Sequence, residues 1–494
     1  MITATQLYNA VQCPHRVALD AFGNPADRDE PNAFIELLWE QGLAHEASVV
    51  ASLGVTANMS LVPEQEREAQ TLDAMRRGEP LIFGGRISHG DKVGIPDLLK
   101  LRGNGYAAGD IKAGSGFDGD AEEGKLKKHY AVQISHYTNI LEGLNVSDGS
   151  REPFIVDRTG QEVPYPLSAP QGVRNTVSWW DSYQIVLNDV RSLLAGTATS
   201  RPAMSAGCKL CHWYRHCKET LIGSNDLTLI AELGRSKRDT IAAALPTVAA
   251  LARCNPEQFF EGGKTVFPGI GRDTLIKFHE RAKLLATPNA RPYLKKALTL
   301  PVAQHEVYFD IEADPMADIV YLHGFVERPH GQPAQARFAP YFADGTAPEC
   351  EEQVFAQAWR YLCARVQDSI VYYYSPYERT AYKKLAKTYP TVCSVEDVEA
   401  LFALPAMIDL YLDVIKKCTE WPTYDQSIKT LAQYLGFHWR DTHPSGAASI
   451  EWYHRWIETG DLAIKQRILD YNEDDCLATG VVVDGVRTLT LRGA

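Results

Sequence analysis

The sequence predicts an α/β protein with more than one domain, and three features of the chain support this. Residues 1–220 contain short strands followed by helices, which is typical of an α/β core. Residues 224–298 are rich in Ala, Leu, Lys and Arg with helical periodicity, so we expect this segment to be entirely helical. From Val307 onward, strands and helices alternate again. We therefore predict three domains with boundaries near residues 222 and 300, namely 1–222, 223–300 and 301–494.

Length and composition agree with this division. The chain has 494 residues, and a typical domain has about 150 residues. Hydrophobic residues make up 45% and charged residues 23% of the chain, a balance that argues against a disordered or fibrous protein. The net charge of −12 does not by itself suggest nucleic-acid binding, but carboxylates that hold metal ions can still bind phosphates.

Neither a membrane span nor an export signal is expected. Charges interrupt every apolar run well before the roughly 20 residues needed to cross a bilayer. The N-terminus lacks the basic stretch and apolar core of a secretion signal. We therefore expect a cytoplasmic protein that does not enter the membrane. In that compartment the ten cysteines are not expected to form a disulfide framework.

The expected elements follow from local periodicity and from turn residues between them. In the first segment we expect helices around Ala33–Leu53 and Lys125–Glu142, and strands near Leu81–Ser88, Lys92–Leu101 and Tyr106–Ile111. In the last segment we expect strands at His305–Asp310, Ile319–Phe325 and Ser369–Tyr374, and helices at Tyr377–Thr388 and Leu462–Thr479.

Two acidic motifs lie on neighbouring strands of the first segment. Pro96-Asp97 lies beside one expected strand, and Asp110-Ile111-Lys112 lies at the end of the next. Side chains alternate along a strand, so Asp110 and Lys112 are expected on one face. Asp97 can then share a metal ion with Asp110, while Lys112 positions a water or stabilises developing negative charge. Carboxylate and water ligands suit Mg²⁺ or Mn²⁺.

Three further residues extend this first constellation. His45 lies on the expected helix around 33–53, and Gln133 and Tyr137 are four residues apart on one face of a later helix. The ordered set of His, Pro-Asp, Asp-x-Lys and Gln-x3-Tyr resembles the RecB-type branch of the PD-(D/E)XK nucleases, which have a restriction-endonuclease-like fold. The resemblance implies that the two aspartates and the histidine bind metal and that the lysine assists catalysis. It also implies that Gln133 and Tyr137 orient the site or the DNA.

Two glycine-containing turns in the middle segment form a weak internal repeat, at Gly234–Ile241 and Gly269–Ile276. The second copy resembles a helix-hairpin-helix. There, Gly269 and Gly271 would let backbone amides approach a phosphate beside a helix N-terminus. The alternative is a pair of ordinary helix–helix turns.

Four of the ten cysteines are arranged as a group of metal ligands, Cys13, Cys208, Cys211 and Cys217. Four thiolates hold either a zinc ion or an iron–sulfur cluster, and the nearby His212 and His216 keep zinc open. One early and three late cysteines around a nuclease core resemble the iron–sulfur RecB-like nucleases. The resemblance implies a structural 4Fe–4S cluster that fastens the two ends of the domain together, because ligation closes a very long loop.

A second acidic constellation spans the last segment. Asp310 and Glu312 end a strand and face one way. Tyr471 and Asp475 are four residues apart and share a helix face. A strand Asp-x-Glu followed by a helical Tyr-x3-Asp resembles the DEDDy exonucleases, which have the ribonuclease H-like fold and act on 3′ ends. The resemblance implies that the acids bind two divalent ions and that the tyrosine positions the attacking water.

The fourth acid departs from that family's pattern. The family has Asp near the start of a helix, where this sequence has Glu378. Glutamate also ligates Mg²⁺, but its extra methylene changes its reach. Asp409 is the alternative fourth acid. Residues 427–431, SIKTL, also resemble the family's Ser-Leu-Lys element, which precedes its last motif.

Taken together, the chain resembles bacterial RecB-like nucleases that join an iron–sulfur PD-(D/E)XK domain, a helical connector and a YprB-like ribonuclease H-like domain. We therefore expect a Mg²⁺- or Mn²⁺-dependent nuclease that hydrolyses DNA, at single-stranded ends, through two separate sites. A helicase partner is suggested by the RecB analogy alone. The alternatives are a ribonuclease, a structural zinc protein, and a nucleic-acid-binding scaffold with one or both sites degenerate. The departure at Glu378 favours the scaffold.

Overall fold

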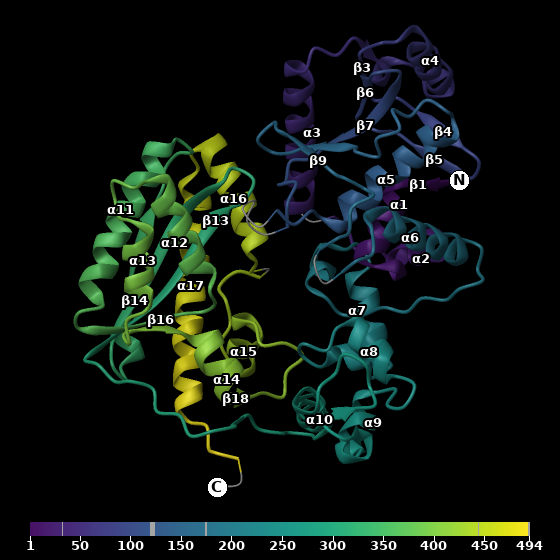
Figure 1. Cartoon of the computed structure of the whole chain (residues 1–494). Coiled ribbons are helices and arrows are strands. Elements are labelled where there is room, and N and C mark those ends of the chain that lie inside the picture. Colours follow the sequence, from purple (N-terminus) through teal and green to yellow (C-terminus); the bar gives the residue numbers. More distant parts are fainter. Residues whose placement is uncertain (32, 119–123, 173–174, 443, 493–494) are drawn as a thin grey trace. The chain divides into compact units, whose positions relative to one another are not determined.

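The structure is a computed structural model that describes residues 1–31, 33–118, 124–172, 175–442 and 444–492. It divides into two compact units, Met1–Thr220 and Leu221–Ala494 (Figure 1). Among the described residues, no helix combines the length and the apolar character that a membrane span requires. The protein is thus a mixed α/β chain, and each unit is described by itself.

The first unit contains a six-stranded sheet between two helices. Its strands, in sheet order, are β2 (Ala57–Asn58), β3 (Leu81–Phe83), β6 (Leu98–Arg102), β7 (Gly105–Ile111), β8 (Phe154–Val156) and β9 (Glu162–Pro164). Strands β3, β6 and β7 are antiparallel, whereas β7 and β8 are parallel. Val49 of α3 (Ala33–Ser52) packs on Phe83 and Leu98, and Ile134 of α5 (Lys128–Gly143) packs on Leu99. Because neighbouring strand residues face opposite ways, the two helices cover opposite faces of the sheet.

Two of the expected strands are divided into two. The segment expected at Lys92–Leu101 forms β5 (Lys92–Gly94) and β6, because Pro96 lacks the amide hydrogen that a continuous ladder requires. The segment expected near Leu81–Ser88 forms β3 and β4 (Ile87–His89). Strands β4 and β5 join β1 (Ile2–Thr3) in a separate three-stranded sheet.

The first unit also contains several further helices, of which the first directly follows β1. They are α1 (Ala4–Gln12), α2 (Pro14–Phe22), α4 (Glu64–Arg77), α6 (Trp179–Leu194) and α7 (Tyr214–Gly223), the last of which crosses the boundary between the units. Thr3 and Gln6 form a capping box that starts α1. Cys13 ends α1 and directly precedes α2, so its position is set by both helices.

The second unit contains a mixed five-stranded sheet. In sheet order its strands are β15 (Arg337–Phe342), β14 (Ile319–Pro329), β13 (His305–Asp314), β16 (Ser369–Tyr373) and β17 (Met407–Asp409). The first three are antiparallel, and β13, β16 and β17 are parallel. Alternation along β13 sends Val307, Phe309 and Ile311 into one hydrophobic cluster and Tyr308 into another.

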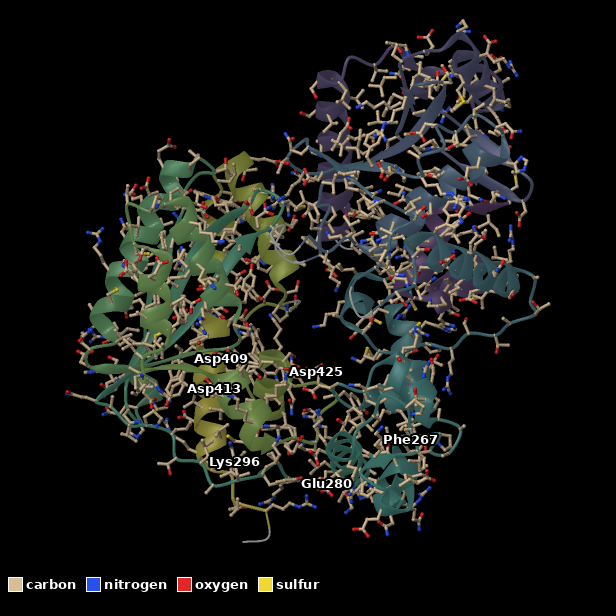
Figure 2. The ribbon with its side chains drawn as sticks, viewed as in Figure 1. Phe267, Glu280, Lys296, Asp409, Asp413 and Asp425 are labelled. Carbon is tan, nitrogen blue, oxygen red and sulfur yellow. The ribbon has the colours of Figure 1, made fainter. Side chains whose placement is uncertain are left out.

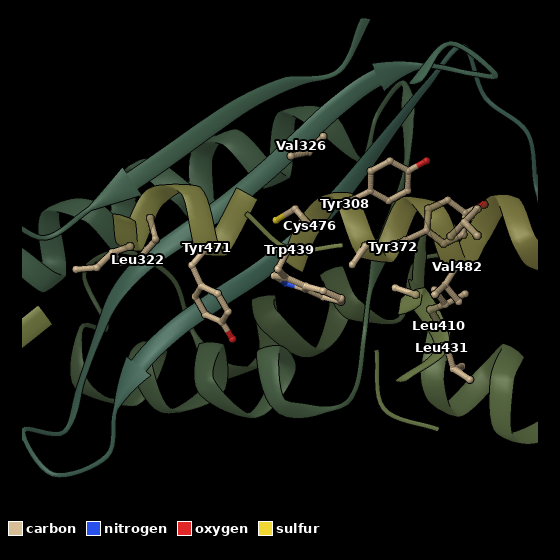
Figure 3. Close-up of a cluster of buried hydrophobic side chains, with 14 of the residues drawn as sticks. Tyr308, Leu322, Val326, Tyr372, Leu410, Leu431, Trp439, Tyr471, Cys476 and Val482 are labelled. Atoms are coloured by element: carbon tan, nitrogen blue, oxygen red, sulfur yellow. The ribbon is translucent and has the colours of Figure 1, made fainter. Parts of the chain in front are cut away.

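Helices cover both faces of this sheet (Figure 1). The cluster around Phe309 receives α11 (Pro348–Arg365), α12 (Tyr377–Thr388) and α13 (Val395–Phe402). The cluster around Tyr308 receives α15 (Ile428–Tyr434), α16 (Gly446–Thr459) and α17 (Leu462–Arg487). Figure 3 shows Tyr471, Cys476 and Val482 along α17, on the face that also receives Leu322 and Val326 of β14. Helix α17 therefore brings the C-terminal acids against the central strand.

The expectation that residues 224–298 are entirely helical is wrong. Helices α8 (Arg235–Ile241), α9 (Val248–Arg253) and α10 (Arg272–Ala286) form there, but so do β10 (Phe260–Glu261), β11 (Lys264–Thr265) and β12 (Tyr293–Leu294). Strands β10 and β11 are joined by Gly262-Gly263, a two-residue loop typical of a tight hairpin. This local turn signal outweighs the helical composition around it.

This middle segment packs as part of the second unit. Strand β12 pairs with β18 (Thr419–Glu420). Arg281 of α10 donates from Nε to Glu420 Oε2 at 2.8 Å, and both side chains are buried. A buried ion pair loses much of its hydration, so breaking it by removing one partner is strongly destabilising. The helical segment is therefore held to the sheet-containing part of its unit.

Candidate active sites

Three carboxylates from two distant segments meet at one end of the sheet in the second unit. Asp310 and Glu312 project from β13 and Asp475 from α17, and one oxygen of each lies within 4.8 Å of the others. This is the edge at which the parallel strands end, where open α/β sheets place their ligands. In the described parts of the chain, no other three His, Cys, Asp or Glu ligand atoms lie this close together.

A glycine on the neighbouring strand makes room for the residue that holds Asp310. Gly324 lies opposite Asp310 in the register of β13 and β14. Asn472 of α17 donates from Nδ2 to Asp310 Oδ2 at 2.7 Å. A Cβ atom at position 324 would lie 1.6 Å from Asn472 Oδ1. Only glycine therefore lets Asn472 approach closely enough to orient the carboxylate.

Asp475 and Tyr471 are held by two residues from a different part of the chain. Trp439 donates from Nε1 to Asp475 Oδ1 at 2.7 Å. Lys429 of α15 donates from Nζ to the Tyr471 hydroxyl at 2.7 Å and lies 3.6 Å from Asp475 Oδ1. Figure 3 shows Trp439 and Tyr471 near α17, and the Lys429 ammonium lies 5.4 Å and 4.4 Å from their ring centroids. Lys429 therefore places an ammonium group among the acids of this site.

Burial and mutual repulsion raise the pKa values of these acids. Burial raises the pKa of Glu312 to about 8, and the charge of Asp475 adds to the effect. Burial and then the charges of Asp475 and Glu312 raise the pKa of Asp310 well above its usual range. A divalent cation at this position would favour the ionised carboxylates, so the donor set and the charge both fit Mg²⁺ or Mn²⁺.

Glu378 lies close enough to influence this cluster, although it is outside the group of three. It is 3% exposed at the start of α12. Burial raises the pKa of Glu378 to about 8, Asp409 adds to the effect, and the charge of Glu378 in turn raises the pKa of Asp310. Ser375, just before α12, has a φ of 132°, a backbone strain typical of functional sites.

The alternative fourth acid has another partner. Asp409 accepts a hydrogen bond on Oδ1 from the backbone amide of Leu412 at 2.7 Å. It thereby caps the helix that follows β17, at Leu410–Ile415 (Figure 2). A carboxylate used as a helix cap is less available to a metal ion. Neither Glu378 nor Asp409 belongs to the group of three carboxylates.

The acids of the first constellation also meet. Asp97 accepts a hydrogen bond on Oδ2 from the amide of Ile111 at 2.7 Å, beside Asp110 on β7. The Lys112 ammonium forms an ion pair with Asp110 Oδ2. Burial and then the charge of Asp110 raise the pKa of Asp97. Burial opposes the charge on Lys112, but Asp110 and Asp97 outweigh it and raise the lysine pKa.

Helix α5 brings the predicted glutamine and tyrosine to Asp110. Gln133 Nε2 lies 3.4 Å from Asp110 Oδ1 and 3.3 Å from the Tyr137 hydroxyl. Burial, followed by the charge of Asp110, raises the pKa of Tyr137 well above its usual range. The tyrosine therefore stays protonated at neutral pH and can act only as a neutral hydrogen-bonding group.

Buried polar atoms at this site lack hydrogen bonds within the described residues. Beside Lys112 they are Gln133 Oε1 and Asp110 Oδ2, which has only its ion pair with that lysine, and His45 Nε2 on α3 is likewise buried without a hydrogen bond. Buried polar atoms are nearly always paired in folded proteins. Two such electron-pair donors on neighbouring side chains fit a divalent cation, whereas His45 and the two aspartates do not gather within 4.8 Å of one another.

Sequence reasoning missed Glu46, which follows His45 on α3. Burial and then the charge of Asp110 raise the pKa of Glu46, and Glu46 in turn raises that of Asp97. Glu46 therefore lies near enough to these acids to act on them electrostatically. The sequence does place an acidic residue directly after the predicted histidine, which could have indicated a further acid at the site. Glutamate on an amphipathic helix is usually solvated, however, so this position did not stand out.

The four predicted cysteines line one cavity of about 180 Å³ in the first unit, Cys13, Cys208, Cys211 and Cys217. The two neighbouring histidines face carboxylates instead. His212 Nε2 lies 2.7 Å from Asp20 Oδ1, and His216 Nδ1 lies 3.7 Å from Asp27 Oδ2. The donor set around the cavity is therefore four sulfurs, without either imidazole.

The glycine turn predicted to contact phosphate lies at the start of α10. Phe267 (Figure 2) accepts a hydrogen bond from the Ile270 amide at 3.2 Å, and Gly269, after Pro268, has a φ of 74°. Proline followed by a positive-φ glycine is typical of a type II turn. Gly271 caps α10 without a side-chain hydrogen bond. Helices α9 and α10 pack together in space. In the sequence they are joined by residues 254–271, which include the β10–β11 hairpin, and not by a short turn.

Comparison with known families bears on the second unit. Residues 307–486 match the family model of the RNase_H superfamily. This segment is thus an RNase H-like nuclease domain, a class that cleaves nucleic acids and generally uses Mg²⁺ or Mn²⁺. Among curated proteins, no match to the chain is found. The matched segment contains every acid of the second constellation.

Proposed function

We propose that this protein is a Mg²⁺- or Mn²⁺-dependent exonuclease that acts on single-stranded ends of DNA through two separate sites. The observation that carries the proposal is the convergence of Asp310, Glu312 and Asp475 within 4.8 Å inside an RNase H-like nuclease domain. Three carboxylates this close, two of them buried and Asp310 half-buried, repel one another strongly unless cations neutralise them. Bound divalent ions would stabilise the attacking and leaving oxygens of phosphodiester hydrolysis.

In the second site, acidic side chains would bind the ions and a tyrosine hydroxyl would supply a proton for hydrogen bonding. Asp310, Glu312 and Asp475 would bind the ions, with Glu378 as the fourth acid. Lys429 donates to the oxygen of the Tyr471 hydroxyl. The Tyr471 hydroxyl also hydrogen-bonds the Asp475 carboxylate. With Asp475 bound to an ion, the phenolic proton would be available to orient a water molecule. Burial and then the charge of Asp475 raise the pKa of Tyr471 well above its usual range, so it acts as a neutral donor and not as a base.

For the first site we propose a PD-(D/E)XK nuclease of the RecB type. The order of α3, β3, β6, β7, α5 and β8 supports this, since the acids lie at β6 and β7 and the glutamine and tyrosine on the next helix. Asp97, Asp110 and His45 would bind the ion, with Glu46 as an additional acid. Lys112 would leave Asp110 when the ion binds and then stabilise the developing charge on the phosphate.

For the cysteine cavity we propose a structural 4Fe–4S cluster. Zinc bound at about 2.3 Å by tetrahedral thiolates would bring their sulfurs to about 3.8 Å from one another. Among the described residues, no three cysteine sulfurs lie within 4.8 Å of one another. A cluster spreads its thiolates over several iron atoms, so it fits this wider spacing better than a single ion does. Its role would be to join Cys13 to the distant end of the domain.

The nuclease proposal is tested with 5′- and 3′-labelled single- and double-stranded DNA and RNA, in Mg²⁺ and in Mn²⁺. We expect Asp310→Asn to abolish release of nucleotides from 3′ ends and Asp110→Asn to remove the remaining activity. Each variant serves as the control for the other site. Wild-type protein, loaded with iron, that leaves every substrate uncut in both ions would overturn the proposal.

The second candidate function is a nucleic-acid-binding scaffold, which the glutamate at position 378 favours. A scaffold has no need to bind two ions at the second site. Calorimetric titration of Mn²⁺ into wild-type protein and into Asp310→Asn therefore separates the two functions. Two equivalents lost on substitution support the nuclease, whereas an unchanged titration supports the scaffold. Cleavage of RNA alone in the labelled series would instead identify a ribonuclease.

With either nucleic acid as the substrate, Gly269 and Gly271 would contact its backbone phosphates.

A further inference from the structure

Arg16 lines the cavity in which the four cysteines would bind a cofactor. It is on α2, one turn after Cys13, and it lines the same cavity as the cysteine sulfurs. Among the described residues that line this cavity, Arg16 is the only one with a cationic side chain. The other lining residues are small, polar or aromatic, with Gln12, Ser205 and Trp213 among them.

One hydrogen-bond donor of Arg16 has no partner. Its Nε atom is buried and makes no hydrogen bond within the described residues. The nearest acid is Asp20, whose Oδ2 lies 3.7 Å from Nε, which is too long for a hydrogen bond. A buried guanidinium donor left unsatisfied costs free energy. The described part of the chain therefore leaves this donor without an acceptor.

A positively charged side chain beside the four cysteines would offset the negative charge that their thiolates bring to the cavity. Four thiolates carry negative charge, and a cluster bound by them remains negative overall. Arg16 is the cationic residue that lines the same cavity as the four cysteine sulfurs. Its positive charge therefore acts electrostatically on those sulfurs.

We propose that Arg16 donates its Nε–H to a sulfur of the iron–sulfur cluster and so sets the reduction potential and oxidative stability of that cluster. This inference rests on the cluster proposed above. Hydrogen bonds and positive charge near cluster sulfurs stabilise the reduced, more negative state and raise the potential. The step is a single electron added to the cluster by a chemical reductant, with no bond made or broken in the protein. Arg16 is a positioning and tuning residue, because it acts through the cluster.

Arg28 provides a matched control. Its NH2 group lies 3.8 Å from the same Asp20, and its guanidinium lies 5.1 Å from the ring centroid of Trp213. It is not among the residues that line the cysteine cavity. Substituting Arg28 removes one positive charge from the same acid network without removing a donor that faces the sulfurs.

The experiment compares wild-type protein with Arg16→Gln, Arg16→Lys and Arg28→Gln, all full-length and purified without oxygen. Iron and zinc content, the visible and electron paramagnetic resonance spectra, the reduction potential and the rate of bleaching in air are measured for each. For Arg16→Gln we expect the ratio of reduced to oxidised cluster at a fixed potential to fall about tenfold, which is about 59 mV for one electron. We also expect faster bleaching in air. Arg16→Lys keeps the charge but not the directed donor, so its shift should be smaller, and Arg28→Gln should match wild type.

The outcomes distinguish a failure of the Arg16 proposal from a failure of the cluster proposal on which it rests. Wild-type protein that carries zinc, or no metal, overturns the cluster proposal and the role of Arg16 with it. Wild-type protein that carries the cluster, with an unchanged potential and bleaching rate in Arg16→Gln, overturns the role of Arg16 alone. An equal shift in Arg28→Gln does the same, because the effect would then be one of general charge. If Arg16→Gln does not fold, the Arg16→Lys variant decides between these outcomes.

Discussion

Lys429 donates a hydrogen bond of 2.7 Å to the hydroxyl oxygen of Tyr471. The two residues are 42 positions apart, on α15 and α17. The Tyr471 hydroxyl thus accepts from Lys429, and it also hydrogen-bonds the Asp475 carboxylate, so the two neighbours together orient the phenolic proton. The bond from Lys429 also places an ammonium group against the Asp475 carboxylate, at 3.6 Å.

Removing that ammonium should slow the second site without unfolding the protein. We expect Lys429→Met to lower the single-turnover rate on 3′-labelled single-stranded DNA by about 10²-fold, the scale of a positioned proton donor or acceptor. Tyr471→Phe should have a similar effect, and the double variant should lose little more, because the two residues act as one unit. Lys283→Met, in the α10 ion pair with Glu280, is the control and should match wild type. Fully additive losses would contradict the coupling.

Metal binding at the second site should release protons near neutral pH. The pKa values of Glu312 and Glu378 are raised to about 8, so both carboxyls are largely protonated at pH 7 in the metal-free protein. Bound Mn²⁺ requires them ionised. We expect the affinity to strengthen as pH rises from 6 to about 9. Calorimetry in two buffers of different ionisation enthalpy measures the released protons, and Glu378→Gln should release fewer. Identical heats in both buffers would contradict this.

The raised pKa of Glu378 also makes a prediction for stability. Its pKa is about 8 in the folded protein, against about 4.3 in the unfolded chain. A raised acid pKa contributes stability that is fully present below about 4.3 and is lost as pH rises through 8. With a chelator present, Glu378→Gln should therefore raise the Tm relative to wild type at pH 8.5 and leave it lower or unchanged at pH 4. A Tm difference that does not vary with pH would exclude the burial effect.

Position 324 should tolerate nothing larger than glycine. In Gly324→Ala the new Cβ displaces Asn472 and breaks its hydrogen bond to Asp310. A lost hydrogen bond to a carboxylate costs about 2 kcal/mol, and the free carboxylate should bind Mn²⁺ more weakly. Denaturant unfolding and Mn²⁺ titration measure the two effects. Gly446→Ala, with open space around its Cβ position, is the control and should change neither.

The cysteine cavity makes a prediction about metal content. Cys211→Ser should lose iron and the cluster spectrum and should lower the Tm of the first unit, since four ligands become three. Cys254→Ser is the control, because Cys254 belongs to the second unit and is not among the residues that line that cavity. Equal iron content in the two variants would remove Cys211 from the ligand set.

Several parts of the fold could be predicted because they depend on local patterns. The alternation of Val307, Phe309 and Ile311 with the residues between them places Asp310 and Glu312 on one face of a strand. The helix predicted at Tyr377–Thr388 has those bounds in the structure. The all-helical expectation for residues 224–298 failed at Gly262-Gly263, where a two-residue turn signal outweighs helical composition.

The chain alone determined which residue types could carry metal chemistry, since spacing along a strand or a helix decides which side chains share a face. Only the tertiary structure decided which neighbours hold them. Trp439, Asn472 and Glu46 reach their acids through contacts between elements far apart in the chain, and no short-range pattern encodes such contacts. The physical reason is that burial and charge at each site are sums over all the elements packed around it.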